Sequence, residues 1–266
     1  MSLDDIFKDV YMANRLMVDL DQESIDLLER NPDYRTAFTP TLQRHLYLTR
    51  LRNLGVNTEQ INQLSEIQKE TNISWKNIYV IATISMNRDK FTKDLLIKQI
   101  LANNDLPALK IVLTLSDFVL NSKYTKFLDE NRSKNVLLYL LQKGKIENAR
   151  LLFTISEIVG SFNDTEYLQK FMTAINNLNL PRFTNMNLTT LLTTIYGSLL
   201  AGAVPTGADK TIKFLADVGH RFSGEDMAYI ARVPEFTYLV PYLLERGSAP
   251  VDEEFYLEEF GQEYRP

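Results

Sequence analysis

Apolar residues recur at helical spacing along almost the whole chain. Ile97, Ile100 and Leu101 form one such set, with the one-turn spacing that places apolar side chains on a single helix face. Alternation of apolar and polar residues, the pattern of a half-buried strand, is scarce. The run most like a strand is NIYVIATI at Asn77–Ile84, but it lacks flanking turn residues and we predict a buried helix there. Only ten glycines and nine prolines occur in 266 residues, which also favours an all-α protein.

Start and stop signals divide this pattern into helices of roughly 8 to 15 residues. Asp21 predicts a helix start, and that helix must stop before Pro32, because the residue before a proline is pushed out of the α region. Thr41 predicts the next start, and Gly55 predicts the corresponding stop. Short polar breaks separate the helices that follow, as in helix bundles and helical solenoids.

Two segments 40 residues apart share a helix–break–helix pattern. They are DLLIKQILANNDLPALKIVL at 94–113 and KNVLLYLLQKGKIENARLLF at 134–153. Asn104 aligns with Gly144 at the break, and both residue types tolerate the left-handed backbone conformation. The match predicts two copies of one helix-pair unit.

A second match, at an offset of 28 residues, occurs later in the chain. IKFLADVG at 212–219 corresponds to VPYLLERG at 240–247, and we expect Gly219 and Gly247 to end helices in the left-handed conformation. The spacings of 40 and 28 differ, so the repeat is irregular. Repeats of this length predict a solenoid in which each unit buries its apolar face on its neighbours.

These units resemble ankyrin repeats. YLLERGSAP is similar to the end of an ankyrin outer helix, YLLQKGKIENARLLF to the inner-helix, glycine and outer-helix core, and SLLAGAVPTGADKTIKFL to a stretched third copy. The resemblance covers fragments of Leu95–Pro250. No copy contains the Thr-Pro-Leu-His opening that links the family's inner helices by hydrogen bonds, and Pro241 would kink or shift the outer helix that it interrupts. The resemblance implies a protein-binding scaffold, of a divergent kind familiar in large DNA viruses and intracellular bacteria.

The stretch DLLERNPDYR resembles part of the short helical F-box-type module that precedes some viral ankyrin arrays, although the usual Leu-Pro opening and terminal tryptophan are absent. We therefore expect a helical region at 1–90, irregular ankyrin-like repeats at 91–250, and an acidic-aromatic tail or cap at 251–266.

Composition narrows the setting of the protein. The absence of cysteine excludes disulfides, thiolate metal sites and cysteine nucleophiles, and it fits an intracellular protein. The net charge of −5 argues against general nucleic-acid binding. MSLDDIFKDV lacks the apolar run of a secretory signal, and we find no apolar stretch of about 18 residues, so no membrane partner is expected. We expect the cytoplasm of the cell or of a host, or an assembled particle.

Motifs for catalysis are weak. His45 and His220 are the only histidines, they form no metal-binding pair, and both are expected as surface or capping residues. A role for His220 as acid or base with Glu225 or Asp226 lacks a matching nucleophile. In GAVPTGADK the residues after the second glycine do not match a phosphate loop, and we predict a connector between helices. No metal or cofactor is expected.

Two charged segments are candidates for contacts. Residues 1–29 carry eight acids and two bases, whereas 30–52 carries five arginines and one acid. The acidic and basic helices either pack together or leave a basic patch that docks an acidic partner. The segment 251–266 has six acids and four aromatic residues, and it either caps the repeats or binds a partner groove.

The sequence thus predicts an all-α, irregular ankyrin-like helix-pair solenoid with an N-terminal helical bundle. We expect a non-catalytic scaffold or adaptor for a protein partner. The alternatives are a structural component of a larger assembly such as a virus particle, and an enzyme whose site is dispersed along the sequence. The tyrosines among the candidates could equally belong to the core. The candidate protein-binding residues are Arg44, Arg50, Arg52, Tyr139, Tyr229, Tyr238, Tyr242, Phe255, Tyr256 and Phe260.

Overall fold

A computed structural model describes residues 10–32, 38–128, 133–178 and 187–265. These residues are helical and contain no strand, with one isolated bridge between Leu120 and Ile146. The all-α prediction is therefore confirmed for the described residues, and the strand-like run Asn77–Ile84 lies in a helix as expected. The first nine residues and the Asp33–Arg35 end of the F-box-like stretch lie outside the description.

The chain divides into two compact units, Met1–Ile100 with Asp105–Phe118, and Leu101–Asn104 with Val119–Pro266. This division rests on packing alone, so the expected organisation into 1–90, 91–250 and 251–266 stays a prediction. The helices of unit 1 are α2 (Val10–Met17), α3 (Gln22–Arg30), α4 (Pro40–Asn53), α5 (Thr58–Thr71), α6 (Trp75–Met86), α7 (Lys90–Ala102, which continues into unit 2) and α8 (Leu106–Leu115). Those of unit 2 are η2 (Ser122–Phe127), α9 (Lys134–Gln142), α10 (Ala149–Gly160), α11 (Thr165–Asn176), α12 (Leu188–Thr206), α13 (Asp209–Asp217), α14 (Gly224–Arg232), η4 (Pro234–Phe236), α15 (Leu239–Glu245) and α16 (Glu253–Phe260).

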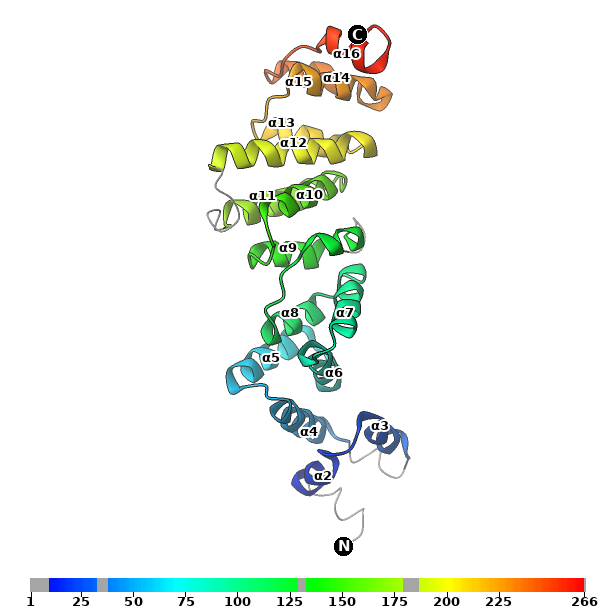
Figure 1. The fold of residues 1–266 in the computed structure, drawn as a ribbon, viewed down its shortest axis with the longest axis vertical. Coiled ribbons are helices and arrows are strands. Elements are labelled where there is room, and N and C mark those ends of the chain that lie inside the picture. The colour runs from blue at the N-terminus through cyan, green and yellow to red at the C-terminus, as the bar shows by residue number, and fades with distance from the viewer. Residues whose placement is uncertain (1–9, 33–37, 129–132, 179–186, 266) are drawn as a thin grey trace. The chain divides into compact units, whose positions relative to one another are not determined.

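Within each unit, many helices pack against the helix two places before or after them in the chain. In unit 1, α4 contacts α2 and α6, and α8 contacts α6 and α5 (Figure 1). In unit 2, α11 contacts α9 and α13, α13 contacts α15, α10 lies along α12, and α14 packs on α16. Amphipathic helices that bury one face on the next-but-one helix produce this pattern.

The contact between α10 and α12 depends on two glycines. A Cβ atom on Gly160 would lie 2.0 Å from the carbonyl oxygen of Leu199, and a Cβ atom on Gly202 would lie 1.8 Å from that of Glu157. No side chain fits at either position, so the backbones of the two helices approach each other directly. Leu199 and Ala203 of α12 are fully buried beside this crossing.

At two places in unit 2, an asparagine at a helix break accepts hydrogen bonds from the start of a later helix. Asn104 and Asn163 both adopt the left-handed conformation, each with φ of 52°. The Asn104 side-chain oxygen accepts hydrogen bonds from two N–H groups at the start of α9, and the Asn163 oxygen accepts one from the N–H of Lys210 at the start of α13. The next residue is aspartate in both cases, and Asp105 and Asp164 cap α8 and α11. The same device thus recurs at two breaks.

The predicted breaks agree well with the backbone. Asn104, Gly144, Gly219 and Gly247 all have positive φ, so the left-handed positions expected from the two repeat matches are confirmed. Pro241 lies in the first turn of α15, which begins at Leu239, and its missing N–H has no helical acceptor there.

Helix starts were predicted less accurately. Asp21 caps α3 by accepting a hydrogen bond from the N–H of Ser24, as expected. The predicted start at Thr41 is wrong: α4 begins at Pro40, because the Thr39 side chain accepts from the N–H of Leu42 and proline is favoured in the first turn.

Helix α12 corrects two further predictions. Its 19 residues are long and apolar enough to cross a membrane by length and composition, so the statement that no such stretch occurs is wrong. Threonines and glycines interrupt the apolar residues of α12, but the mean hydropathy of the helix remains high. The segment GAVPTGADK is also mostly helix, since α12 continues to Thr206 and only Gly207 and Ala208 connect it to α13. Helix α12 packs on α10 and α13 in unit 2, and 33% of its apolar 18-residue stretch is buried there.

Candidate functional site

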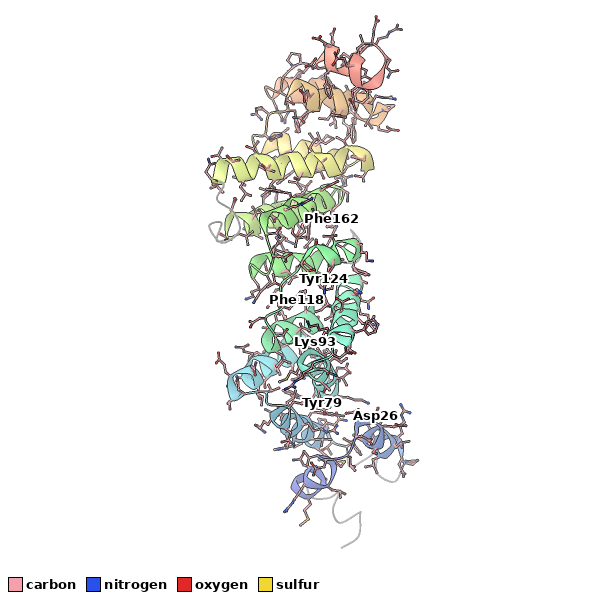
Figure 2. The ribbon with its side chains drawn as sticks, viewed as in Figure 1. Asp26, Tyr79, Lys93, Phe118, Tyr124 and Phe162 are labelled. Carbon is pink, nitrogen blue, oxygen red and sulfur yellow. The ribbon has the colours of Figure 1, made fainter. Side chains whose placement is uncertain are left out.

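Arg50 of α4 is a structural residue rather than an exposed contact. Its side chain is 5% exposed, and it donates hydrogen bonds to the carbonyl oxygens of Val18 and Leu20 and, at 2.9 Å, to the side-chain oxygen of Gln22. Its guanidinium carbon lies 4.9 Å from the ring centre of Tyr79, a residue labelled in Figure 2. These hydrogen bonds hold the Arg50 side chain within unit 1, and a contact of Arg50 with a partner stays a prediction.

The acids of α3 meet a lysine instead of the arginines of α4. Lys76 at the start of α6 lies 2.8 Å from Asp26 and 3.8 Å from Glu29. Desolvation opposes ionisation of Asp26, but hydrogen bonds from Lys76 and Gln22 outweigh it and lower the pKa of Asp26. The same hydrogen bond raises the pKa of Lys76. Helix α2 of the acidic segment packs on α4 of the basic segment. The acids Asp26 and Glu29, however, pair with Lys76 rather than with the arginines of α4.

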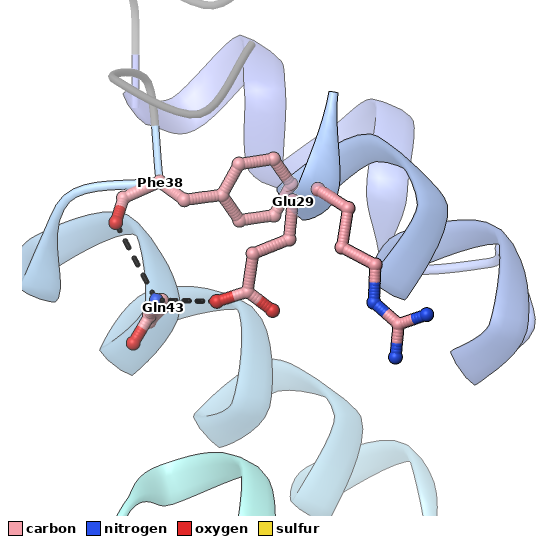
Figure 3. A pocket seen from close by; sticks show the side chains of 4 residues that line it. Glu29, Phe38 and Gln43 are labelled. Atoms are coloured by element: carbon pink, nitrogen blue, oxygen red, sulfur yellow. Dashed lines mark hydrogen bonds between the residues drawn. The ribbon is translucent and has the colours of Figure 1, made fainter. Parts of the chain in front are cut away.

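A hollow of about 490 Å³ lies beside these acids (Figure 3). The described residues that line it are Glu29, Arg30, Phe38 and Gln43. The Gln43 amide donates to Glu29 at 3.1 Å and to the carbonyl oxygen of Phe38 at 3.4 Å, as the dashed lines in Figure 3 show. These bonds hold the lining groups to one another, and they indicate a structural role.

The remaining arginines of α4 flank a second hollow, the α4 groove, of about 400 Å³. Arg44, Leu48 and Arg52 follow one another at four-residue intervals, so they share one helix face. Arg44 and Arg52 are exposed, whereas Leu48 is half-buried against the core of unit 1. The lining is completed by Pro40, Thr41 and His45. The groove therefore has an apolar floor between two cations.

A third hollow, the α12–α14 groove, has a volume of about 320 Å³ and a mostly apolar lining. Helix α14 contributes Asp226 and Tyr229, and the Tyr229 side chain is 41% exposed. Helix α12 contributes Gly197, Leu200, Ala201, Val204 and Pro205. Of these residues only Tyr229 was a candidate from the sequence. The small residues of α12 were the available signal, but their meaning depends on where α14 lies.

Tyr229 also joins this groove to the acidic-aromatic segment. Its ring centre lies 5.6 Å from that of Phe255 and 5.5 Å from that of Phe260. Tyr256 is only 6% exposed and packs edge-on against Phe260, and its role as a partner contact stays a prediction. The aromatic side of α16 is thus turned toward α14. This orientation fits the alternative in which segment 251–266 is a cap.

Tyr238 and Tyr242 flank α13 through polar contacts. The Tyr238 hydroxyl donates to Asp209 at 2.5 Å, and the Tyr242 hydroxyl donates to Asp217 at 2.8 Å. Arg246 also bonds Asp217 at 3.0 Å, and its guanidinium lies 3.6 Å from the centre of the Tyr242 ring. The hydrogen bond from Tyr238 lowers the pKa of Asp209, whereas burial and then the bond to Asp217 raise the pKa of Tyr242. Both tyrosines therefore tie α15 and its flank to α13.

Tyr139 lies apart from the other candidates, on α9. It is half-buried, and the ammonium nitrogen of Lys143 lies 5.5 Å from the centre of its ring. Among the candidate residues, the structure brings Tyr229, Phe255, Tyr256 and Phe260 into one aromatic cluster and places Arg44 and Arg52 around the α4 groove.

His220 is packed between aromatic rings rather than exposed. Its ring centre lies 5.3 Å from that of Tyr196 and 4.8 Å from that of Phe222. Burial lowers the pKa of His220. The Asp226 carboxylate accepts hydrogen bonds from the N–H and hydroxyl of Ser223, which closes the N-terminus of α14. His220 is half-buried, and its backbone N–H donates to the carbonyl oxygen of Leu215 just past the end of α13, in agreement with the expected surface or capping position. In the described part of the chain, no group of three or more acids and histidines could hold a metal ion.

Comparisons with protein-family models, with curated proteins and with solved structures find no match for this chain. The resemblance to ankyrin repeats therefore rests on the chain's own residues.

Proposed function

We propose that the protein is a non-catalytic scaffold that binds a protein partner, and that its helix pairs form an irregular, ankyrin-like solenoid. The alternating contacts of α9, α11, α13 and α15 support this arrangement, as do the left-handed breaks. Asn104 and Asn163 support it further, because their hydrogen bonds between helix pairs supply the kind of link that the Thr-Pro-Leu-His opening supplies in ankyrin repeats. Repeats of this type bind through extended surfaces.

The α12–α14 groove is the observation that carries the proposal. It is concave and apolar, and it is open at Ala201 and Tyr229, both of which are exposed. Aromatic residues at the edge of a hollow are favoured anchors at protein interfaces. Asp226 and the neighbouring exposed Glu225 add negative charge at one side. The proposed partner therefore presents an apolar side chain to the groove and a lysine or arginine beside it.

The chemistry of this groove suits binding better than acid–base catalysis. Asp226 and Tyr229 are its titratable residues among those described, and the carboxylate of Asp226 is already bonded to Ser223. A catalytic site would bring a nucleophile, a base and an orienting group within hydrogen-bond distance of one another.

The test fills the groove with a bulky side chain. Ala201→Trp places an indole at an exposed position of α12, and Thr189→Trp places the same indole at another exposed position three turns away. Tagged wild type and both variants are used to capture proteins from the native source, and retained proteins are quantified by mass spectrometry. We expect proteins held by wild type and by Thr189→Trp to fall about tenfold or more with Ala201→Trp, a change of about 1.4 kcal/mol in binding. Equal retention by all three proteins would overturn the proposal, provided that circular dichroism shows equal helicity.

A further inference from the structure

The α4 groove and helix α16 carry opposite charges around apolar centres. In the groove, Arg44 and Arg52 lie one turn to either side of Leu48, about 12 Å apart along the helix axis. Both arginines are exposed, and neither forms an ion pair with any residue that the structure describes. An anionic ligand could therefore reach both guanidinium groups without displacing an internal partner.

Helix α16 presents the complementary surface on its outer side. Leu257 is 49% exposed, and the carboxylates of Glu254 and Glu258 are exposed beside it, one turn apart. Glu253 and Glu259 add two more exposed acids. Within the described part of the chain, none of these four carboxylates has an ion-pair partner. The opposite side of the helix is occupied by its contact with α14, so this acidic side is the one left for a second molecule.

We propose that α16 of one copy of the chain docks in the α4 groove of a second copy. Leu257 lies on the floor formed by Leu48 and Pro40, while Glu254 and Glu258 pair with Arg44 and Arg52. The two surfaces belong to different parts of the chain, so the association is head-to-tail: one molecule of the pair keeps its groove free and the other keeps its helix α16 free for further copies. This contact is separate from the α12–α14 groove and does not depend on the proposed function.

The physical character of the contact determines how it is measured. Ion pairs between exposed side chains are weak and are screened by salt, and only a small apolar area is buried around one leucine. The association is therefore expected at high protein concentration and low ionic strength. Sedimentation velocity suits this range, because it reports the average mass without immobilising the protein.

The experiment uses two variants with opposite charge reversals. One carries Arg44→Glu and Arg52→Glu, and the other carries Glu254→Arg and Glu258→Arg. Each is sedimented alone, and the two are then mixed in equal amounts, from about 5 to about 500 µM and at about 50 or about 500 mM salt. In the mixture, the acidic groove of the first variant faces the basic helix of the second, and the unchanged pair of surfaces also remains.

We expect the average mass of wild type to rise with concentration at low salt and to return to the monomer at high salt. Each variant alone stays monomeric, and the mixture associates again. A matched control, Arg88→Glu with Lys90→Glu, makes the same charge change at exposed residues outside the groove and keeps wild-type behaviour.

Three results would each overturn the proposal. They are a wild type that stays monomeric over the whole range, variants that associate as wild type does, and a mixture that fails to associate although each variant keeps wild-type helicity. Because none of these measurements uses the partner captured through the α12–α14 groove, failure here and failure of the proposed function are distinguishable.

Discussion

The crossing of α10 and α12 predicts that a single added methyl group destabilises unit 2. In Gly202→Ala the new Cβ would lie 1.8 Å from the carbonyl oxygen of Glu157, about 1.6 Å short of the 3.4 Å at which ordinary contact begins. The obstacle is backbone, so it cannot be relieved by rotating a side chain. The two helices must separate, and the buried contacts of Leu199 and Ala203 loosen with them.

The expected magnitude combines two opposing effects. Overpacking of a buried contact typically costs 1–3 kcal/mol, and a backbone clash belongs near the upper end, at about 3 kcal/mol. Alanine is better than glycine in a helix interior by about 1 kcal/mol. The net loss is therefore about 2 kcal/mol. With a urea dependence of about 2 kcal/mol per molar, the midpoint of unfolding should fall by about 1 M.

The assay and its control come from the same helix. Urea unfolding is followed by circular dichroism, which reports both units, and by fluorescence of Trp75, the only tryptophan, which lies in unit 1. We expect Gly202→Ala to shift the dichroism transition to lower urea. Gly197→Ala is the matched control: its Cβ meets nothing within 4 Å, so it should stabilise the protein by up to about 1 kcal/mol. The reasoning fails if both variants unfold at the same urea concentration.

Three further predictions concern other contacts. Asn163→Ala removes the hydrogen bond from the N–H of Lys210 and strains the backbone, so thermal unfolding should show a loss of about 1–2 kcal/mol of stability. Asn163→Gly should lose less, because glycine keeps the left-handed conformation without strain. Equal losses in the two variants would refute the separate contribution of the backbone conformation. Burial lowers the pKa of His220 in the folded protein. The stability that its neutral form contributes is therefore fully present above the unfolded pKa of about 6.5 and is lost as pH falls through the folded pKa. In urea unfolding measured from neutral to mildly acidic pH, the free energy of unfolding should decline less steeply for His220→Gln than for wild type. Arg50→Met removes the donor to the part-buried carbonyl oxygens of Val18 and Leu20 and should destabilise unit 1 by about 2 kcal/mol in the tryptophan fluorescence transition. The exposed Arg52→Met should stay within about 0.5 kcal/mol.

The arginines of α4 illustrate where prediction from the sequence stops. Their clustering after an acidic segment left two alternatives, packing of the two segments or an exposed basic patch; α2 does pack on α4, but the acids Asp26 and Glu29 of α3 pair with Lys76. Arg50 and Arg52 lie two residues apart on one helix, so they face different directions, and one is buried while the other is exposed. Which direction is the interior depends on where α2 and α3 lie. The sequence pattern alone carried no information on that choice.

The candidate aromatic residues show the same limit. The sequence left segment 251–266 as either a cap or a partner-binding segment, and only the contacts of Phe255 and Phe260 with Tyr229 show that its aromatic side is turned toward α14. The α12–α14 groove was not predicted, because its lining comes from residues of two helices separated by a third helix in the chain.

The sequence by itself determined that the described chain is helical and where several of its helices end, since helical periodicity, caps and left-handed residues act over a few neighbouring positions. Asn104, Gly144, Gly219 and Gly247 could be assigned for that reason. The tertiary structure alone decided which surfaces are buried, which charges are left without partners, and where the grooves open. Those properties depend on contacts between residues far apart in the chain, such as Gly202 with Glu157, and no local pattern specifies them.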